Sequence, residues 1–554
     1  MKIIEGKILD TNYDLLNRDK RLDENLAAAS VRGLSKHSSE HHIYDASFDK
    51  SMNNGTFLAL CLALAKYFRR EFPDDGRLGI ALPSGIAGNA ANVACQMAGK
   101  VSVNINFTMG ASAAAACFKK ADVKTVISAD MLRAKIAQKI PDFPWPDRFF
   151  DISKILKKIG KAEVVKNLLA VKLLPASAII RLYKIPTSGG DREASIIFTS
   201  GSEGDPKAAV LTHKNIMGNC LQMEATGIVT KDTVLHSNLP LFHSFGQSIQ
   251  VWLTSIFAHK TVAAASPLEV KQNFDAIQKG KSTIMISTPT FLRSYLKKGD
   301  PKQIESLKFV IAGAEKSPDG FKEMWEEKFA NCQYKEGYGL TEASPVVAVN
   351  LPEGLEKNKY RDYETQTRAK AVGQLFAGMQ AAILNPDTGE FLPIGETGLL
   401  CLKGANVFGG YLNAPELNAE KFKDGWLITG DLASLDSDGF VYIKGRLSRF
   451  SKIGGEMVPH ALVEERIIKA LKQECAEKPT VAIGSRESES KGEELVLITT
   501  LDITPSDLRR ELADFGLANL WIPKVVIKVD EIPTLATGKL NLGEIRKIAK
   551  DSKK

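Results

Sequence analysis

The stretch "TSGSEGDPKAAVLTH", Thr199 to His213, gathers glycines, hydroxyl groups and a single lysine. The preceding "ASIIFTS" predicts a strand, and "KAAVLT" predicts a second short strand. A helix is expected only afterwards, in "HKNIMGNC", with Thr212 as its N-cap. The stretch is therefore predicted to be a glycine-rich loop between two strands, and its N–H groups, hydroxyls and lysine suit a polyphosphate.

This loop differs from a P-loop, G-x-x-x-x-G-K-[ST], in both spacing and context. Gly201 and Gly204 are three residues apart, and Lys207 stands three beyond the second glycine. A P-loop also runs from a strand directly into the helix whose N-terminus holds the phosphate. An ordinary surface turn is the alternative, and the loop alone does not decide between the two.

Size and composition limit the class of protein. The chain has 554 residues, enough for several domains, and its net charge of +8 is too mild to indicate nucleic acid binding. The seven cysteines are scattered without a C-x-x-C pair, so we expect no disulfide framework or zinc site. The N-terminus lacks an apolar signal core, and no apolar run reaches about 18 residues. A cytoplasmic protein without a signal peptide or transmembrane helix is expected.

Strand and helix patterns alternate from about residue 55 to 345, which predicts an α/β region of parallel sheets with binding sites at the carboxyl ends of strands. The clearest patterns are a helix in "TFLALCLALAKYFRREF" and strands in "RLGIALPSG", "STIMISTPT" and "SLKFVIAGAE". After about residue 370, short strands between glycine turns predict an antiparallel or barrel-like part. From about residue 446, helix and strand patterns such as "HALVEERIIKALKQ" and "ELVLITT" predict a compact α+β domain.

Four further stretches accompany the opening one: "NLPLFHSFG" (238–246), "EGYGLTEASP" (336–345), "WLITGDLASLDSDGFVYIKGRLSRFSKIGGEMV" (426–458) and "PTLATGKL" (533–540). Together and in this order, the five resemble the adenylate-forming superfamily of acyl-CoA synthetases, luciferases and peptide-synthetase adenylation domains. They look most like the acyl-[acyl-carrier-protein] synthetase part of bacterial acyl-acyl-carrier-protein synthetase/2-acylglycerophosphoethanolamine acyltransferases. No H-x-x-x-x-D acyltransferase signature is present, so a free-standing synthetase is expected.

The resemblance implies a large AMP- and acyl-binding domain, 1–445, and a small mobile domain, 446–554, with a hinge near 446–452. It also implies that ATP and Mg²⁺ activate a fatty acid as acyl-AMP. It assigns the contacts with ATP or AMP to Thr199, Ser200, Gly201, Ser202, Gly204 and Lys207 at the β- and γ-phosphates, Gly313, Ala314, Glu315, Gly337, Tyr338 and Gly339 around adenine, and Asp431 and Arg446 at the ribose.

The same resemblance implies three catalytic residues. Lys539 would reach the α-phosphate and the attacking carboxylate, Thr341 would touch the α-phosphate, and Glu342 would hold Mg²⁺. His243 would lie between the nucleotide and the acyl pocket, and a buried core histidine is the alternative reading. A solvated surface lysine is the plain alternative for Lys207 and Lys539. A helix N-terminal acid is the plain alternative for Glu342.

The sequence departs from many relatives at Arg449, where they have an acidic hinge residue, so a carboxylate-based hinge role is not carried over. The expected thiol acceptor is holo acyl carrier protein. Coenzyme A stays open as the alternative because its phosphopantetheine arm is chemically identical. A catalytically silent acyl-binding protein on the same fold is the rival from another class.

The segment 151–185 is basic and amphipathic. Ile152, Ile155, Leu156, Ile159 and Ala162 share one helical face, and Lys154, Lys157, Lys158 and Lys161 share the other. From Lys154 to Lys184 there are eight Lys and Arg against one Glu. This pattern predicts peripheral contact with an anionic membrane, with a surface helix packed on the large domain as the alternative.

Overall fold

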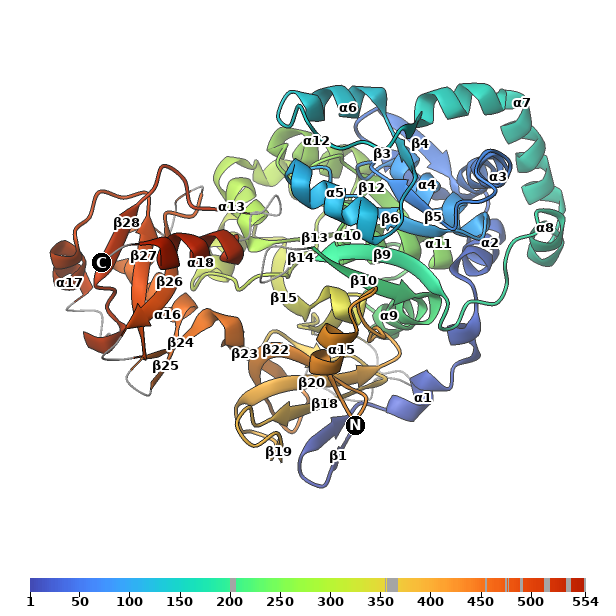
Figure 1. The fold of residues 1–554 in the computed structure, drawn as a ribbon. Coiled ribbons are helices and arrows are strands. Elements are labelled where there is room, and N and C mark those ends of the chain that lie inside the picture. The colour runs from blue at the N-terminus through green and yellow to red at the C-terminus, as the bar shows by residue number, and fades with distance from the viewer. Residues whose placement is uncertain are drawn as a thin grey trace.

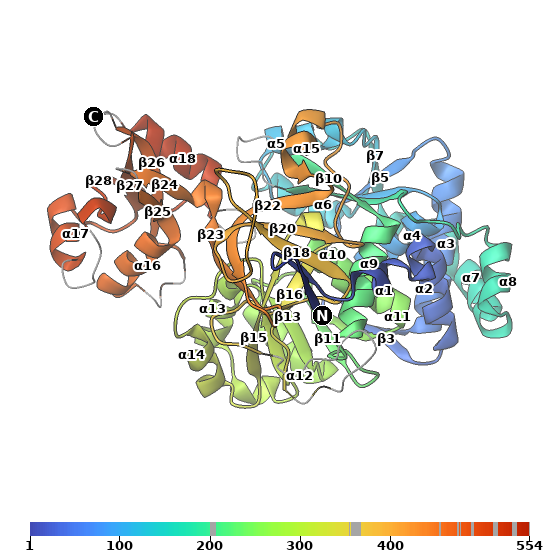
Figure 2. The same cartoon turned by 90° about the horizontal axis from the view of Figure 1, so that it is seen from below.

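The computed structural model describes residues 1–199, 206–353, 355, 367–453, 456–473, 476, 478–488, 492–512, 519–534 and 540–552. Within these ranges the strands form four β-sheets, three in a large body and one in a smaller C-terminal unit (Figures 1 and 2). No helix in the described ranges is long and apolar enough to cross a bilayer.

The first sheet carries the opening loop. Its order is β10-β9-β6-β5-β7-β8, and every pair is parallel except β10 with β9. Its strands are β5 (Arg77–Ile80), β6 (Val101–Asn104), β7 (Thr125–Ser128), β8 (Arg148–Asp151), β9 (Glu193–Thr199) and β10 (Lys207–Thr212). The helices between these strands are α4 (Ile86–Met97), α5 (Ala111–Lys120), α6 (Asp130–Ala137), α7 (Ile152–Leu173) and α8 (Ala176–Leu182). The two strands predicted on either side of the glycine-rich stretch are confirmed as β9 and β10.

The second sheet has the order β17-β16-β15-β14-β13-β11-β12-β3-β4, and the pairs from β3 to β15 are parallel. Its strands are β3 (His41–Asp45), β4 (Lys50–Asn53), β11 (Val234–Ser237), β12 (Lys260–Ala263), β13 (Ile284–Ser287), β14 (Phe309–Ala312), β15 (Gln333–Gly339), β16 (Val346–Val349) and β17 (Gln374–Leu375). The helical segments along this part are α9 (His213–Ala225), α10 (Ser244–Gln247), η2 (Ser248–Leu253), α11 (Thr254–Phe257), α12 (Val270–Gly280), α13 (Pro289–Lys298), η3 (Pro301–Ile304), α14 (Phe321–Lys328) and η4 (Thr341–Ala343). As predicted, Thr212 caps α9: its hydroxyl accepts a hydrogen bond from the Asn215 N–H.

The third sheet is antiparallel throughout and forms the part predicted as antiparallel or barrel-like. Its strands are β1 (Lys2–Ile4), β2 (Ile8–Asp10), β18 (Met379–Leu384), β19 (Phe391–Leu392), β20 (Gly398–Gly404), β21 (Phe422–Lys423), β22 (Trp426–Leu435) and β23 (Val441–Arg446), with α15 (Pro415–Lys421) before β21. Strands β1 and β2 were not predicted from the sequence. They join this sheet because β2 pairs with β18, far along the chain.

Helices fill the space between the sheets of the large body. The N-terminal ones are α1 (Tyr13–Asn17), η1 (Lys20–Asp23), α2 (Leu26–Lys36) and α3 (Asn54–Glu71), the last being the helix predicted in "TFLALCLALAKYFRREF". One continuous cluster of buried apolar side chains runs from Leu9 to Val441 and includes members of all three sheets. The three sheets therefore share a single core.

The C-terminal unit has its own sheet and its own apolar clusters, which contain only residues from 453 onward. Its elements are η5 (Leu447–Arg449), β24 (Phe450–Ile453), β25 (Glu456–Pro459), α16 (His460–Ala470), β26 (Val481–Ser488), β27 (Gly492–Thr499), α17 (Pro505–Leu512), η7 (Asn519–Trp521), β28 (Val525–Lys528) and α18 (Leu542–Asp551). The patterned helices and strands of this region appear as predicted. The boundary at 446 stays a prediction.

Among the described residues, two ion pairs connect this unit with the large body: Lys316 with Glu465 at 2.9 Å, and Lys469 with Asp319 at 3.1 Å. At least one partner of each pair is more than half exposed. Such pairs contribute little to stability, about 0–1 kcal/mol each.

Helix α7 differs from its prediction. Ile152 and Ile155 are buried in the core, and Leu156 and Ile159 pack against it. The prediction that this apolar face meets a membrane is therefore wrong for the first half of the helix, because the face packs on α3 instead. Gly160, at φ 77°, interrupts the helix and changes the direction of the second half.

Arg449, where many relatives have an acid, points into the C-terminal unit. Its guanidinium forms an ion pair with Glu464, and both side chains are nearly buried. The Glu464 carboxylate also accepts a hydrogen bond from the Ile483 N–H at 2.7 Å, which ties the pair to β26. Arg449 therefore belongs to the structure of the small unit.

We expect Glu464→Gln to destabilise the C-terminal unit by about 3–5 kcal/mol, because it leaves the Arg449 guanidinium buried without its counter-charge. Hydrogen exchange of peptides from β26 and β27 in a urea series measures this change. The matched control is Glu531→Gln, which breaks the exposed pair with Lys478 and should change stability by less than about 1 kcal/mol. Equal effects of the two variants would contradict the buried pair.

Candidate active site

The ends of two neighbouring parallel strands bring the predicted adenine residues together. Ala312, the last residue of β14, pairs with Glu336 of β15, so Gly313 and Gly337 follow side by side. A Cβ atom on Gly313 would lie 3.2 Å from the Gly337 carbonyl oxygen. Glycine therefore permits the close approach of the two backbones, which leaves their next residues facing the carboxyl edge of the sheet.

Tyr338 joins this edge to the antiparallel sheet. Its hydroxyl donates a 2.6 Å hydrogen bond to the Asp431 carboxylate on β22. Burial of the ring, and then the Asp431 charge, raise the pKa of the Tyr338 hydroxyl well above its ordinary value. The hydroxyl therefore stays protonated and serves as a donor at neutral pH.

Arg446 stands opposite Asp431 in the β22–β23 register, and its Nε lies 3.5 Å from the carboxylate. The Asp431 charge raises the pKa of the Arg446 guanidinium. The two predicted ribose residues are thus a cross-strand ion pair at the same edge. Asp431 lies within strand β22 and is therefore not a turn residue.

Glu342 and Thr341 lie in the short turn that follows β15. The Glu342 carboxylate accepts a hydrogen bond from the Tyr411 hydroxyl, and the Glu342 carbonyl accepts one from the Phe408 N–H at 2.9 Å. Thr341 accepts a 3.2 Å hydrogen bond from the Ser244 hydroxyl. These contacts hold Thr341 beside the start of α10 and Glu342 against the segment that contains Phe408 and Tyr411.

Lys207 begins β10 and pairs in register with Thr199 across the glycine-rich loop. Its Nζ lies 6.0 Å from the centre of the Tyr411 ring. Ser200, Gly201, Ser202, Gly204 and Lys539 lie outside the described residues. Lys207, at one end of the loop, nevertheless lies near Tyr411, the residue that bonds to Glu342.

Two polar residues of this cluster were missed by the sequence analysis. Tyr411 lies in this cluster because the segment around it pairs with β10. The Leu412 N–H donates a 2.9 Å hydrogen bond to the Ala208 carbonyl. A glycine pair before the tyrosine, in "GGYLN", was the available signal.

Lys421, the last residue of α15, is the second polar residue of the cluster that was not predicted from the sequence. Its Nζ lies 3.7 Å from the position that a Cβ atom on Gly430 would occupy, next to Asp431. Burial lowers the pKa of Lys421, Glu342 acts in the opposite direction, and the charges of Arg446 and Lys207 lower it further. Lys421 makes no hydrogen bond or ion pair within the described ranges, so its ammonium group faces the cluster without a fixed partner.

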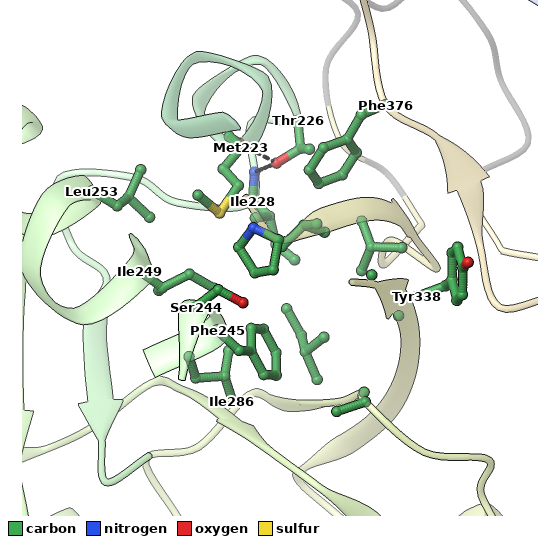
Figure 3. Close-up of a pocket in the computed structure, with 18 of the residues that line it drawn as sticks. Met223, Thr226, Ile228, Ser244, Phe245, Ile249, Leu253, Ile286, Tyr338 and Phe376 are labelled. Atoms are coloured by element: carbon green, nitrogen blue, oxygen red, sulfur yellow. Dashed lines mark hydrogen bonds between the residues drawn. The ribbon is translucent and has the colours of Figure 1, made fainter. Parts of the chain in front are cut away.

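An apolar pocket lined by Tyr338 and Thr341 lies in the large body (Figure 3). It encloses about 930 Å³ of empty space, a volume that includes its open mouth. Gly313, Ala314, Gly337, Tyr338, Gly339 and Thr341 line one end, with His243. Tyr338 lies on the opposite side from Ile249 and Leu253 in Figure 3. The pocket therefore connects the predicted nucleotide residues with an aliphatic interior.

The interior wall comes from several elements. Ile249 and Leu253 come from the π-helical turn η2, which interrupts the helix from Ser244 to Phe257. The remaining apolar residues include Met223, Ile228, Leu235, Ile284, Ile286 and Phe376. No Lys, Arg, Asp or Glu is among the described residues that line the pocket. The charged residues of the cluster therefore lie outside the pocket lining.

Not every predicted side chain faces the pocket. Glu315 accepts a 2.6 Å hydrogen bond from the Thr290 N–H, so its carboxylate holds the start of α13. His243 does line the pocket, and its place between the nucleotide and the acyl chain stays a prediction. Within the described ranges, no group of three His, Cys, Asp or Glu could hold a metal ion. Glu342 is an oxygen ligand that suits Mg²⁺, a cation bound through one or two carboxylates together with phosphate oxygens.

Comparison with known proteins gives a consistent picture. A family model described as "AMP-binding enzyme" matches residues 35–412. An acyl-CoA ligase, SID4, of Ajellomyces capsulatus is 31% identical over 336 residues, covering 57% of this chain and 55% of that protein. A feruloyl-CoA synthase of an Amycolatopsis species is 28% identical, covering 70% and 77%. The chain spans about half the length of the first curated relatives that it matches.

Among solved structures, o-succinylbenzoate coenzyme A synthetase (MenE) of Bacillus subtilis, in complex with ATP and a magnesium ion, superposes with a TM-score of 0.74. The match covers 95% of this chain and 99% of MenE at 20% identity. At this identity the likeness establishes the fold, which is the predicted adenylate-forming fold.

We expect Lys421→Met to weaken ATP binding about 10- to 100-fold, because a hydrogen bond to a charged group contributes about 1.5–3 kcal/mol. Adenosine, which carries no phosphate, should bind the variant as it binds the wild type. Calorimetric titration of both ligands measures the difference. Lys423→Met, at an exposed lysine that bonds to the Gly389 carbonyl, is the matched control. An unchanged ATP affinity would remove Lys421 from the site.

Proposed function

The chain belongs to the AMP-binding enzyme family, and we propose that it is an ATP- and Mg²⁺-dependent ligase that activates a fatty acid as acyl-AMP and transfers the acyl group to a thiol. The observation that carries this proposal is the apolar pocket that Tyr338 and Thr341 line, next to Glu342 in the chain. A fatty acid whose tail fills that pocket has its carboxylate at the charged end, where the α-phosphate would lie.

In the first step the carboxylate attacks the α-phosphate, and each described residue of the cluster has a separate role in it. Asp431 and Arg446 would hold the ribose, with Tyr338 fixing the Asp431 carboxylate beside it. Lys207 and Lys421 would offset the phosphate charge, and Thr341 would donate to the α-phosphate. Lys539 is proposed from its sequence motif alone, as the cation at the reacting oxygens. Mg²⁺ held by Glu342 would neutralise the charge on the departing pyrophosphate.

The pocket lining favours an aliphatic acid over a hydroxylated aromatic one. A phenol buried at the closed end would need a polar partner, since an unsatisfied buried hydroxyl costs about 1–3 kcal/mol. Thr226 is a polar side chain of the interior, and its hydroxyl already donates to the Met223 carbonyl and accepts from the Ile228 N–H. A hydrocarbon tail needs no hydrogen-bond partner.

The proposed acceptor is the phosphopantetheine thiol of holo acyl carrier protein, which rests on the sequence motifs. Coenzyme A is the second candidate, and the names of the curated relatives, which are CoA ligases and a CoA synthase, favour it. The intact Lys207, Glu342, Asp431 and Arg446 argue against a silent acyl-binding protein. The predicted contact of 151–185 with an anionic membrane also stays a proposal.

We expect fatty-acid-dependent exchange of pyrophosphate into ATP, with apparent affinity rising about fourfold per added CH₂, since each buried CH₂ contributes about 0.8 kcal/mol. The rise should end when the pocket is full. Ferulate and coumarate should give no exchange. Mass analysis of the thioester formed with holo carrier protein or coenzyme A, supplied in turn, identifies the acceptor. Exchange with hydroxycinnamates instead of fatty acids would overturn the substrate class.

We expect Glu342→Gln to raise the Mg²⁺ concentration needed for half-maximal exchange by at least about tenfold, because the change keeps the shape and removes the charge that a hard cation requires. A Mg²⁺ titration of the exchange reaction measures it. Glu420→Gln, at an exposed position on α15, should leave the titration unchanged. Overlapping curves for Glu342→Gln and the wild type would show that Glu342 is not the ligand.

A further inference from the structure

The second half of α7 exposes an aliphatic stripe. Val165, Leu169 and Leu173 are 55%, 54% and 77% exposed. They are four residues apart, which places neighbours about 40° apart around a helix. Leu174 and Leu182, at 36% and 60%, extend the exposed apolar surface toward α8. We call these five residues the α7–α8 stripe. Figures 1 and 2 place α7 and α8 at the rim of the large body, on the side away from the C-terminal unit.

The opposite side of the same helix is fixed to the protein. Asn167 is buried, donates to the Ala59 carbonyl on α3 at 3.2 Å and accepts from the Tyr183 hydroxyl at 2.7 Å. Val171 is buried in the core, and Glu163 forms an ion pair with Lys66 of α3. The stripe therefore cannot turn inward without breaking these contacts.

Cations flank the stripe. The helical period places Lys166 on one side of it and Lys161 and Lys172 on the other, and all three are exposed. Arg181 and Lys184 continue the basic surface on and after α8. None of these five basic side chains forms an ion pair with a described residue. By contrast, Lys154 and Lys158, on the first half of α7, pair with Asp130 and Glu71.

We propose that the α7–α8 stripe docks the protein on the surface of an anionic lipid bilayer. The aliphatic tips enter the boundary between headgroups and acyl chains, and the flanking lysines reach the anionic headgroups through their flexible stems. The inner contacts of Asn167 and Val171 hold the helix parallel to that surface. Docking at this face leaves the C-terminal unit, on the far side, away from the membrane.

The composition of the surface favours a bilayer over a protein partner. Protein interfaces are rich in Tyr, Trp and Arg anchors and poor in Lys, and Leu and Val are under-represented among their strongest contacts. The stripe consists of Leu and Val among lysines. A second copy of this chain would bring the same unpaired cations to a two-fold interface, where they repel one another.

The location also serves the proposed function, on which this part of the argument rests. A long fatty acid leaves water for the bilayer, because each CH₂ gains free energy on transfer to an apolar phase. An enzyme held at the bilayer surface meets this substrate where it is concentrated.

Vesicle flotation of the full chain tests the proposal. We expect the wild type to float with vesicles of phosphatidylcholine and phosphatidylglycerol at low salt, and to stay at the bottom with phosphatidylcholine alone. Val165→Ser, Leu169→Ser and Leu173→Ser combined should lower the floated fraction at least fivefold. Lys161→Gln, Lys166→Gln and Lys172→Gln combined should do the same.

Matched controls change the same residue types elsewhere on the surface: Leu15→Ser with Leu268→Ser, and Lys20→Gln, Lys139→Gln and Lys231→Gln together. These should float as the wild type does. Pyrophosphate exchange with octanoate, a water-soluble acid, should be equal in all variants, which shows that they fold. Because flotation requires no catalysis, its result is independent of the proposed reaction.

Three outcomes overturn the proposal. In the first, the wild type stays at the bottom with anionic vesicles. In the second, the serine and glutamine variants float as well as the controls. In the third, sedimentation shows a dimer, or binding of holo carrier protein, that the serine variant abolishes while its flotation is unaffected. The last result would assign the stripe to a protein partner.

Discussion

The hydrogen bond from Tyr338 to Asp431 joins two sheets that otherwise have separate strand orders, and the geometry of the candidate site depends on it. Tyr338 ends a run of parallel strands, and Asp431 sits in the antiparallel sheet opposite Arg446. The bond fixes a carboxylate where two sheet edges meet. The close approach of Gly313 and Gly337 sets the position of Tyr338 in turn. The same edge opens into the apolar pocket, so one junction separates a charged region from an aliphatic one.

Local features of the fold followed from the sequence. The Thr212 cap, the strands on either side of the glycine-rich loop and the elements of the C-terminal unit depend on neighbouring residues, through periodicity and capping. The site was predictable where a motif marked it, as for Glu342 and Asp431, and their placement in one cluster agrees with that reading. Their chemical roles stay predictions.

Other features of the fold and the site depend on contacts between segments that are distant in the chain. Local sequence patterns do not predict such contacts. Tyr411 reaches the cluster because the segment from 410 to 412 pairs with β10. Lys421 reaches it because the end of α15 lies against Gly430 of β22. The error in α7 has a similar origin. The apolar face was predicted from Ile152 to Ala162, but Gly160 redirects the helix, so the first half covers α3 and the second half exposes different residues.

The pairing of β2 with β18 has a consequence for how the chain is made. Thr11 bonds to Met379, 368 residues later, and Leu9 is fully buried in the shared core. At synthesis rates of about 5–20 residues per second, the first strands wait roughly 20–75 s for their partner to leave the ribosome. During that interval β1 and β2 present unpaired edges, which are the surfaces that aggregate most readily. The sheet that supplies Asp431 is thus completed late, and the nascent chain depends on protection of its earliest strands.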